Sequence, residues 1–165
     1  MRRALLLLIP LVLLASACGA KKVKTTAGGP PAAAVVLGSG AHALYAGGGW
    51  AVVTRGTKVV VAHLVGNTWK IDTSGKVKIS ILGPRGTAAS IPQVAAELKA
   101  PSALVEDALW VDGKELLEKG GGLKPSNVTI YGAPDKKLAK GTHVAIAYGR
   151  TATSGTAVRW TFRVV

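Results

Sequence analysis

Few side chains in this sequence could do chemistry: three histidines, a single cysteine and eight acids. His42, His63 and His143 lack the short spacings at which metal ligands recur. His143 is the first candidate for a catalytic site, but it has no placed partner, so a local hydrogen bond near the start of a strand is the simpler interpretation. Glu106 and Asp107 are the only adjacent acids, and we expect them in a solvated loop. The chain has no nucleophile elbow, HExxH motif or phosphate-binding loop. The sequence therefore predicts a protein that is not an enzyme and has neither metal nor cofactor; a small hydrolase using His143 is the weaker alternative.

The single cysteine, Cys18, directly follows a segment typical of export signals. Residues 1–17 read MRRALLLLIPLVLLASA, with two arginines, an apolar run and then small residues. The apolar run is much shorter than the roughly 20 residues that a membrane-spanning helix needs. Together with Cys18, this segment resembles the lipobox of bacterial lipoproteins, which implies that Cys18 receives lipid and becomes the mature N-terminus. Ala15 stands where leucine is most frequent, and Ala15-x-Ala17 also suits an ordinary signal peptidase.

The predicted location is therefore outside the cytoplasm. We expect the signal peptide at residues 1–17 and a flexible, lipid-anchored tether at residues 18–34, because that stretch is rich in Gly, Pro, Thr and Ala. The anchor would hold the protein at the outer face of the cytoplasmic membrane or elsewhere in the cell envelope. A soluble, secreted product remains the alternative.

The charge balance is strongly basic. Without residues 1–17, 19 basic and 8 acidic residues remain, a formal charge of +11. An exported protein meets little nucleic acid, so we expect no nucleic-acid partner. Anionic lipid, an anionic cell-wall polymer or polysaccharide, or another envelope protein are the predicted counterparts. Solubility alone explains the charge equally well.

The apolar pattern predicts strands throughout. Residues 35–75 contain short apolar runs separated by glycines, which indicates a β-ribbon extension or a small β subdomain. Residues 76–165 alternate apolar and polar side chains between turn signals, most clearly at Val158, Trp160, Phe162 and Val164. This pattern predicts an all-β fold: an antiparallel β-sandwich preceded by an N-terminal ribbon.

Residues 76–165 also resemble the immunoglobulin-like domains of bacterial surface proteins. The resemblance rests on an ordered series of short motifs: Gly83-Pro84, Pro92-x-Val94-x-Ala96-x-Leu98, Val111-Asp112-Gly113, Tyr131-Gly132-Ala133-Pro134, Leu138-x-x-Gly141-Thr142-His143 and Trp160-x-Phe162-x-Val164. It implies a non-catalytic binding or spacer module. His143 departs from the family pattern because it is out of phase with Val144, Ile146 and Tyr148. Either His143 faces outward or its strand is buried on both faces.

Three tryptophans are candidates for a binding surface. Trp50, Trp69 and Trp110 are not assigned to the core by alternation, in contrast to Trp160. If these side chains are exposed, they form a possible binding surface together with His143. Such a surface would offer an aromatic platform for a sugar or a protein partner. If residues 35–75 instead fold over Trp110, this side chain lies in the seam between the two parts. We favour the seam, because large exposed apolar patches are uncommon in monomers.

Overall fold

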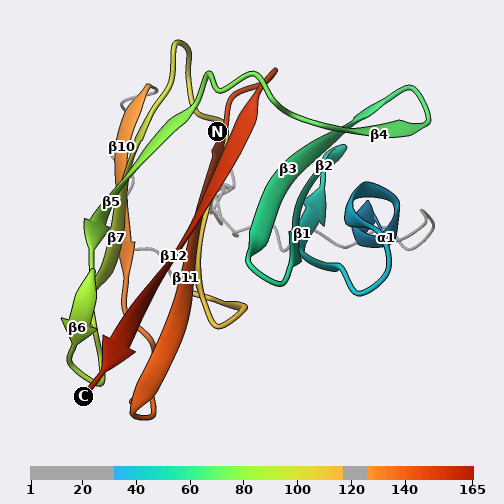
Figure 1. Ribbon diagram of the computed structural model, residues 1–165. Helices are drawn as coiled ribbons and strands as arrows, with labels where there is room; N and C mark the ends of the chain where they lie inside the picture. The colour runs from blue at the N-terminus through green and yellow to red at the C-terminus, as the bar shows by residue number, and fades with distance from the viewer. Residues whose placement is uncertain (1–31, 117–125) are drawn as a thin grey trace, which may run out of the picture.

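The computed structural model describes residues 32–116 and 126–165. The predicted signal peptide, Cys18 and most of the predicted tether lie outside these residues. Within them, strands form three sheets, and two of the sheets face each other as a sandwich while the third packs beside it (Figure 1). None of the described helices has the length and hydropathy to cross a membrane.

The first sheet of the sandwich has three antiparallel strands in the order β10-β7-β5. Their bounds are β5 Lys78–Gly83, β7 Val94–Lys99 and β10 Asn127–Gly132. The second sheet has five strands in the order β6-β12-β11-β8-β9, with β6 parallel to β12 and the other pairs antiparallel. Their bounds are β6 Gly86–Ala88, β8 Glu106–Val111, β9 Lys114–Glu115, β11 Gly141–Arg150 and β12 Gly155–Val164.

This strand order is that of an immunoglobulin-like sandwich. In such a fold, strands A, B and E share one sheet, and strands C, F and G share the other. Here β5, β7 and β10 take the first three places, and β8, β11 and β12 take the other three. The order confirms the predicted all-β, immunoglobulin-like antiparallel β-sandwich.

The sandwich core consists of the inward-facing residues of both sheets. On β12 these are Trp160, Phe162 and Val164, as the alternation predicts, and they pack with Leu98 and Ile130 of the opposite sheet. The Trp160 indole N–H donates to the Pro84 carbonyl oxygen at 3.1 Å, so the one polar atom of this side chain is satisfied. Burial of a large aliphatic or aromatic side chain stabilises a fold by about 1.5–3 kcal/mol.

Asp112 and Gly113, part of the Val111-Asp112-Gly113 motif, form a hairpin turn. It joins β8 to β9, where Val111 pairs with Lys114. Both turn residues have positive φ, 50° at Asp112 and 78° at Gly113. This is the conformation of a type I′ turn, which Asp and Gly tolerate best.

Residues 32–71 form a short helix and a four-stranded antiparallel sheet, which we call the small sheet. Its order is β1-β2-β3-β4. The elements are α1 Ala32–Leu37, β1 His42–Gly47, β2 Trp50–Arg55, β3 Lys58–Val65 and β4 Thr68–Ile71. The tether prediction was wrong for residues 32–34, which belong to α1. Ala33 of this helix packs on Ala51 and Val53 of β2. Burial of this apolar contact stabilises the helix, which contains no charged residue.

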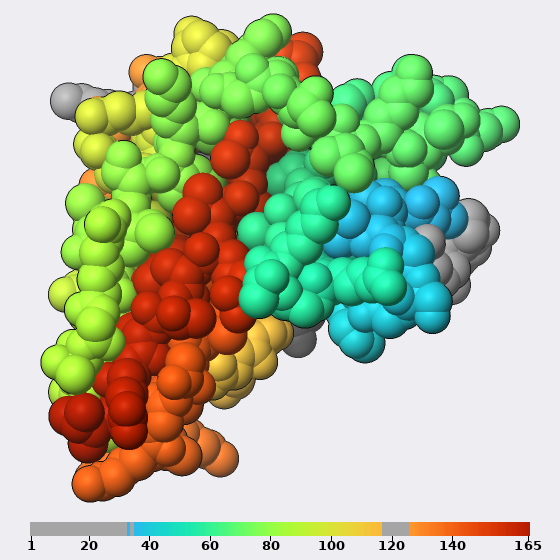
Figure 2. Space-filling view, in the orientation of Figure 1, coloured from blue at the N-terminus to red at the C-terminus, as the bar shows by residue number. Residues whose placement is uncertain are grey.

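The small sheet covers part of the outer face of the five-stranded sheet. Trp50, Val52 and Val61 on its inner side pack with Ala108, Trp110, Ile146 and Tyr148 in a second core, which we call the seam. Figure 2 shows the small sheet seated against β12 and β11, with the lower parts of both strands uncovered. Strand β11 is therefore buried on both faces from Ala145 to Gly149. Of the two alternatives for His143, the second is therefore correct: its strand is buried on both faces, and His143 itself is buried.

Candidate binding surface

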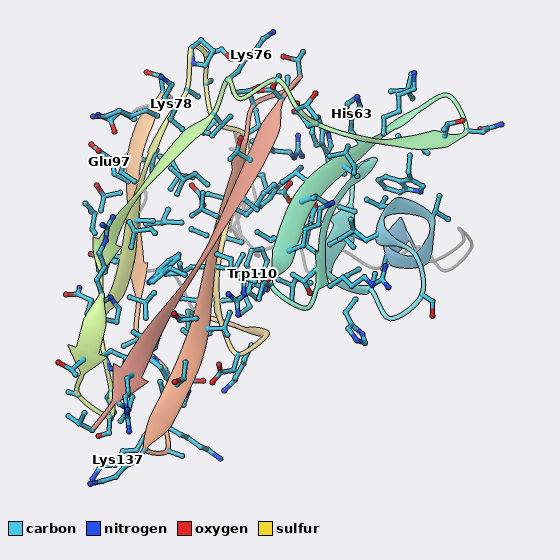
Figure 3. The ribbon with its side chains drawn as sticks, viewed as in Figure 1. His63, Lys76, Lys78, Glu97, Trp110 and Lys137 are labelled. Atoms are coloured by element: carbon cyan, nitrogen blue, oxygen red, sulfur yellow. The ribbon has the colours of Figure 1, made fainter. Side chains whose placement is uncertain are left out.

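Trp50 and Trp110 are structural. They are only 7% and 2% exposed, because the small sheet closes over the five-stranded sheet at the seam. Figure 3 shows Trp110 between the two sheets. Trp69 lies on the opposite side of the small sheet, half-buried against the cluster that includes α1. The prediction of an aromatic platform is wrong for Trp50 and Trp110. The alternative that we favoured, in which Trp110 belongs to the seam, is confirmed.

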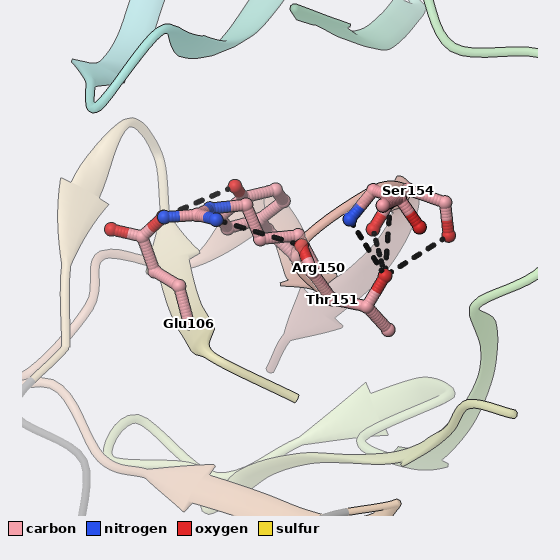
Figure 4. Close-up of polar contacts among 6 residues, drawn as sticks. Glu106, Arg150, Thr151 and Ser154 are labelled. Carbon is pink, nitrogen blue, oxygen red and sulfur yellow. Dashed lines mark hydrogen bonds and ion pairs between the residues drawn. The ribbon is translucent and has the colours of Figure 1, made fainter. Parts of the chain in front are cut away.

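Glu106 and Arg150 form an ion pair at the end of the seam. They are directly opposite each other in register, and Arg150 Nε donates to Glu106 Oε2 at 2.6 Å (Figure 4). The Arg150 guanidinium also lies 5.6 Å from the centre of the Trp50 ring. Burial, together with the hydrogen bond to Glu106, raises the pKa of Tyr45 to about 12. The expected solvated loop at Glu106 was wrong, because this residue begins β8 and is half-buried.

These contacts favour a structural role for the Glu106 pair. The carboxylate has an arginine and the Tyr148 hydroxyl as partners, at 2.6 and 3.3 Å. Both donors contact the same oxygen, Oε2, and fix the carboxylate in place, as expected of a structural ion pair. Among residues 32–116 and 126–165, no group of three metal-ligating side chains comes together.

His143 lies at the edge of the sandwich core. It is 8% exposed, and its ring stacks on Phe162 with centroids 5.6 Å apart. Nδ1 lies 2.7 Å from Asp112 Oδ2, and Nε2 lies 2.7 Å from the Ala139 carbonyl oxygen. Both partners are acceptors, so only the imidazolium can donate to both. The contact with Ala139 is the local hydrogen bond expected from the sequence, whereas Asp112 is 31 residues away in the chain and no local pattern indicates it.

The His143 contacts predict a pH-dependent stability. The hydrogen bonds to Asp112 and Ala139 raise the pKa of His143 above its ordinary 6.5. The raised pKa stabilises the fold fully below about pH 6.5, and this contribution is lost as the pH rises through the folded-state pKa. We expect the wild type to be more stable than Asp112→Asn below about pH 6.5, and this difference in the free energy of unfolding to shrink as the pH rises through the folded-state pKa of His143. Urea titrations at a series of pH values measure the difference. Parallel curves for the two proteins would contradict this role.

The uncovered part of the five-stranded sheet carries a row of basic and hydroxyl side chains. Arg159 is opposite the seam residue Ile146 in register, so it shares the outer face. Alternation places Thr161 and Arg163 on the same face of β12. Thr87 and Thr142 are the neighbours of Arg163 in register, and Lys140 lines a hollow beside them. We call this surface the basic face: Thr87, Lys140, Thr142, Arg159, Thr161 and Arg163.

The basic face is exposed, and no acid that the structure describes pairs with its cations. Arg163, Thr161 and Lys140 are exposed, and Arg159 is half-buried. In the described part of the chain, none of these three cations forms an ion pair with a carboxylate. A hollow of about 450 Å³ runs between Thr87, Lys140 and Arg163. Arg159 and Arg163 are about 13 Å apart along the strand, so the row suits an extended ligand with repeated negative charges better than a single ion.

The sequence indicated only part of this surface. The alternation of Trp160, Phe162 and Val164 leaves Arg159 and Arg163 on the outward side of the strand, but Thr87 joins them through the parallel pairing of β6 with β12. No local motif predicts that contact, because the paired residues are 76 positions apart in the chain.

A second hollow, of about 530 Å³, lies beside Tyr131 on the sandwich. Ile91, Gln93, Pro134 and Asp135 also line it. Lys114 Nζ contacts Asp135 Oδ2 at 3.1 Å, so the acid there is paired with a cation. This hollow is mixed in character and lacks the concentrated charge of the basic face.

The comparisons with known proteins add little to this account. No protein-family model and no curated protein matches the chain. Among solved structures, the chain is similar to the titin Ig tandem domains A164-A165, with 8% sequence identity and a TM-score of 0.36. The match covers 70% of this chain and 60% of that one. The fold assignment therefore rests on the strand order of the structure itself.

Proposed function

We propose that this protein is a lipid-anchored component of the cell envelope whose immunoglobulin-like sandwich is a non-catalytic module that binds an anionic wall polymer. The basic face is the observation that carries the proposal. It gathers Arg159, Arg163 and Lys140 on one uncovered sheet surface, without a described acid to neutralise them. Guanidinium groups suit this task because their fixed fork of N–H donors matches the oxygens of phosphate and carboxylate.

The anchor supplies the location. The signal-like residues 1–17 and Cys18 support export and lipidation, and residues 19–31 separate Cys18 from α1. Thirteen extended residues reach at most about 45 Å. The sandwich would therefore stay close to the membrane, where wall polymer is within reach of the basic face. A secreted protein that binds the same polymer is the second candidate.

Charge removal on the basic face tests the polymer site. We expect the double variant Arg159→Gln, Arg163→Gln to bind poly(glycerol phosphate) about tenfold or more weakly than the wild type. Each cation near an anionic surface contributes on the order of 1 kcal/mol, and 1.4 kcal/mol is a factor of ten. Affinity measured by isothermal titration calorimetry should also fall steeply with salt, because exposed charges are screened.

The matched control is the double variant Lys76→Gln, Lys78→Gln. It removes the same net charge from exposed residues at the start of the three-stranded sheet, away from the basic face (Figure 3). We expect its affinity to stay within about twofold of the wild type. Equal losses in the two double variants would mean that only total charge matters and would refute the site.

A further inference from the structure

The outer side of the small sheet is a second surface with a distinct chemistry. Ala51 and Val53 face away from the seam, toward α1. By register and alternation, Leu64, Trp69 and Ile71 share this side. The same reasoning places Arg55 and Lys58 there, at the hairpin between β2 and β3. We call this surface the distal face: Val35 of α1 with Arg55, Lys58, Leu64, Trp69 and Ile71.

The helix α1 covers only part of the distal face. Leu64 remains 43% exposed, Ile71 39% and Val35 56%. Trp69 between them is half-buried. Exposed apolar side chains that gather on one face mark a surface that contacts another apolar phase or partner.

The charges of the distal face have one sign. Arg55 and Lys58 are exposed, and Arg55 Nη1 donates to the Leu37 carbonyl at 2.9 Å, which fixes it beside α1. The only acid among residues 32–75 is Asp72. Its carboxylate accepts from Gly155 N at 2.7 Å, so it points to the sandwich and not to the distal face. Apolar and aromatic side chains flanked by cations fit an anionic lipid surface.

The segment that follows the proposed lipid anchor joins the described fold on the distal face. The segment from Cys18 enters the described fold through α1, which itself lies on the distal face (Figure 1). A link of thirteen residues, at most about 45 Å long, ties that point to the proposed anchor. The distal face is therefore the described surface that the tether meets first.

We propose that the distal face docks on the anionic headgroup layer of the membrane that holds the anchor, with Trp69, Leu64 and Ile71 at the lipid interface and Arg55 and Lys58 against the headgroups. This inference rests on the proposed anchoring at Cys18. The basic face lies on the five-stranded sheet, one sheet layer behind the small sheet and therefore about 10 Å farther from the docked surface.

Quenching by brominated lipid tests the docking. The full-length protein, purified from membranes in detergent, is reconstituted in vesicles of phosphatidylcholine and phosphatidylglycerol with bromine on the acyl chains near the headgroup. The Trp69 emission is the difference between wild type and Trp69→Phe. We expect brominated vesicles to quench at least about half of it. Leu64→Asp should lose most of the quenching, and the matched control Leu82→Asp, at a 56% exposed residue of β5, should keep it.

Vesicle flotation separates this proposal from the anchoring. Protein that fails to float with the vesicles overturns both the anchor and the docking. Protein that floats while its Trp69 emission is unquenched overturns the docking alone. Trp69 emission shielded from both brominated lipid and aqueous iodide would mean that another segment or a second copy covers the distal face, which also overturns the proposal.

Discussion

Replacing Trp110 by alanine is expected to lower the free energy of unfolding by about 3–5 kcal/mol. Trp110 is 2% exposed at the centre of the seam, and its ring centre lies 6.4 Å from that of Tyr148. The substitution would leave a cavity that two sheets share, and neither sheet can close it without moving the other. A loss of this size is a large fraction of the 5–15 kcal/mol that stabilises a typical domain. Urea unfolding followed by circular dichroism measures it.

A graded series strengthens the Trp110 prediction. Trp110→Phe should recover part of the lost stability, because a smaller ring still fills part of the seam. Trp69→Ala should cost less than Trp110→Ala, because Trp69 is already half-exposed. Limited proteolysis should find faster cleavage between β4 and β5 in Trp110→Ala, where the small sheet joins the sandwich. A cost below about 1 kcal/mol for Trp110→Ala would show that the two parts do not depend on each other.

Replacing Cys18 by alanine is expected to abolish incorporation of labelled palmitate completely. Cys18 is the only cysteine in the chain, so no second thiol can take its place. Because Ala15-x-Ala17 suits an ordinary signal peptidase, the variant should leave the membrane fraction and enter the medium or the soluble envelope fraction. Gel autoradiography and immunoblots of the separated fractions give both readouts.

Ser16→Ala is the matched control for this experiment. It changes a neighbouring small residue to another small residue and keeps Cys18, so labelling and membrane retention should match the wild type. A wild type without label, together with a Cys18→Ala protein that remains in the membrane, would contradict lipid anchoring.

Much of the sandwich could be predicted from the sequence because strands such as β5, β7, β10 and the end of β12 have one buried face. Alternation correctly identifies Trp160, Phe162 and Val164 as inward, whereas Val158 is only half-buried. The Asp112-Gly113 turn fixes a register. The stretch around Glu106 was harder to interpret. Glu106 begins β8, and this strand packs on both sides, with Leu109 in the sandwich core and Trp110 in the seam. Apolar residues therefore occur on both faces, and the apolar-polar alternation of a half-buried strand is absent.

The sites were less predictable because they depend on how separate parts of the chain pack. Nothing local at Trp50 or Trp110 shows that one will cover the other, so the exposed platform and the buried seam looked alike in the sequence. The Asp112 partner of His143 and the place of Thr87 beside Arg163 both arise from long-range pairing. Composition indicated the excess of basic residues, but only the folded sheet shows which of them share a face.

Mass spectrometry of the mature N-terminal peptide tests the central claim most directly. The protein is purified from the membrane fraction and digested, and the peptide that precedes the described fold is identified by its mass. We predict that this peptide begins at Cys18 and carries covalently bound lipid. A peptide with an unmodified Cys18, or one that still begins at Met1, would contradict it.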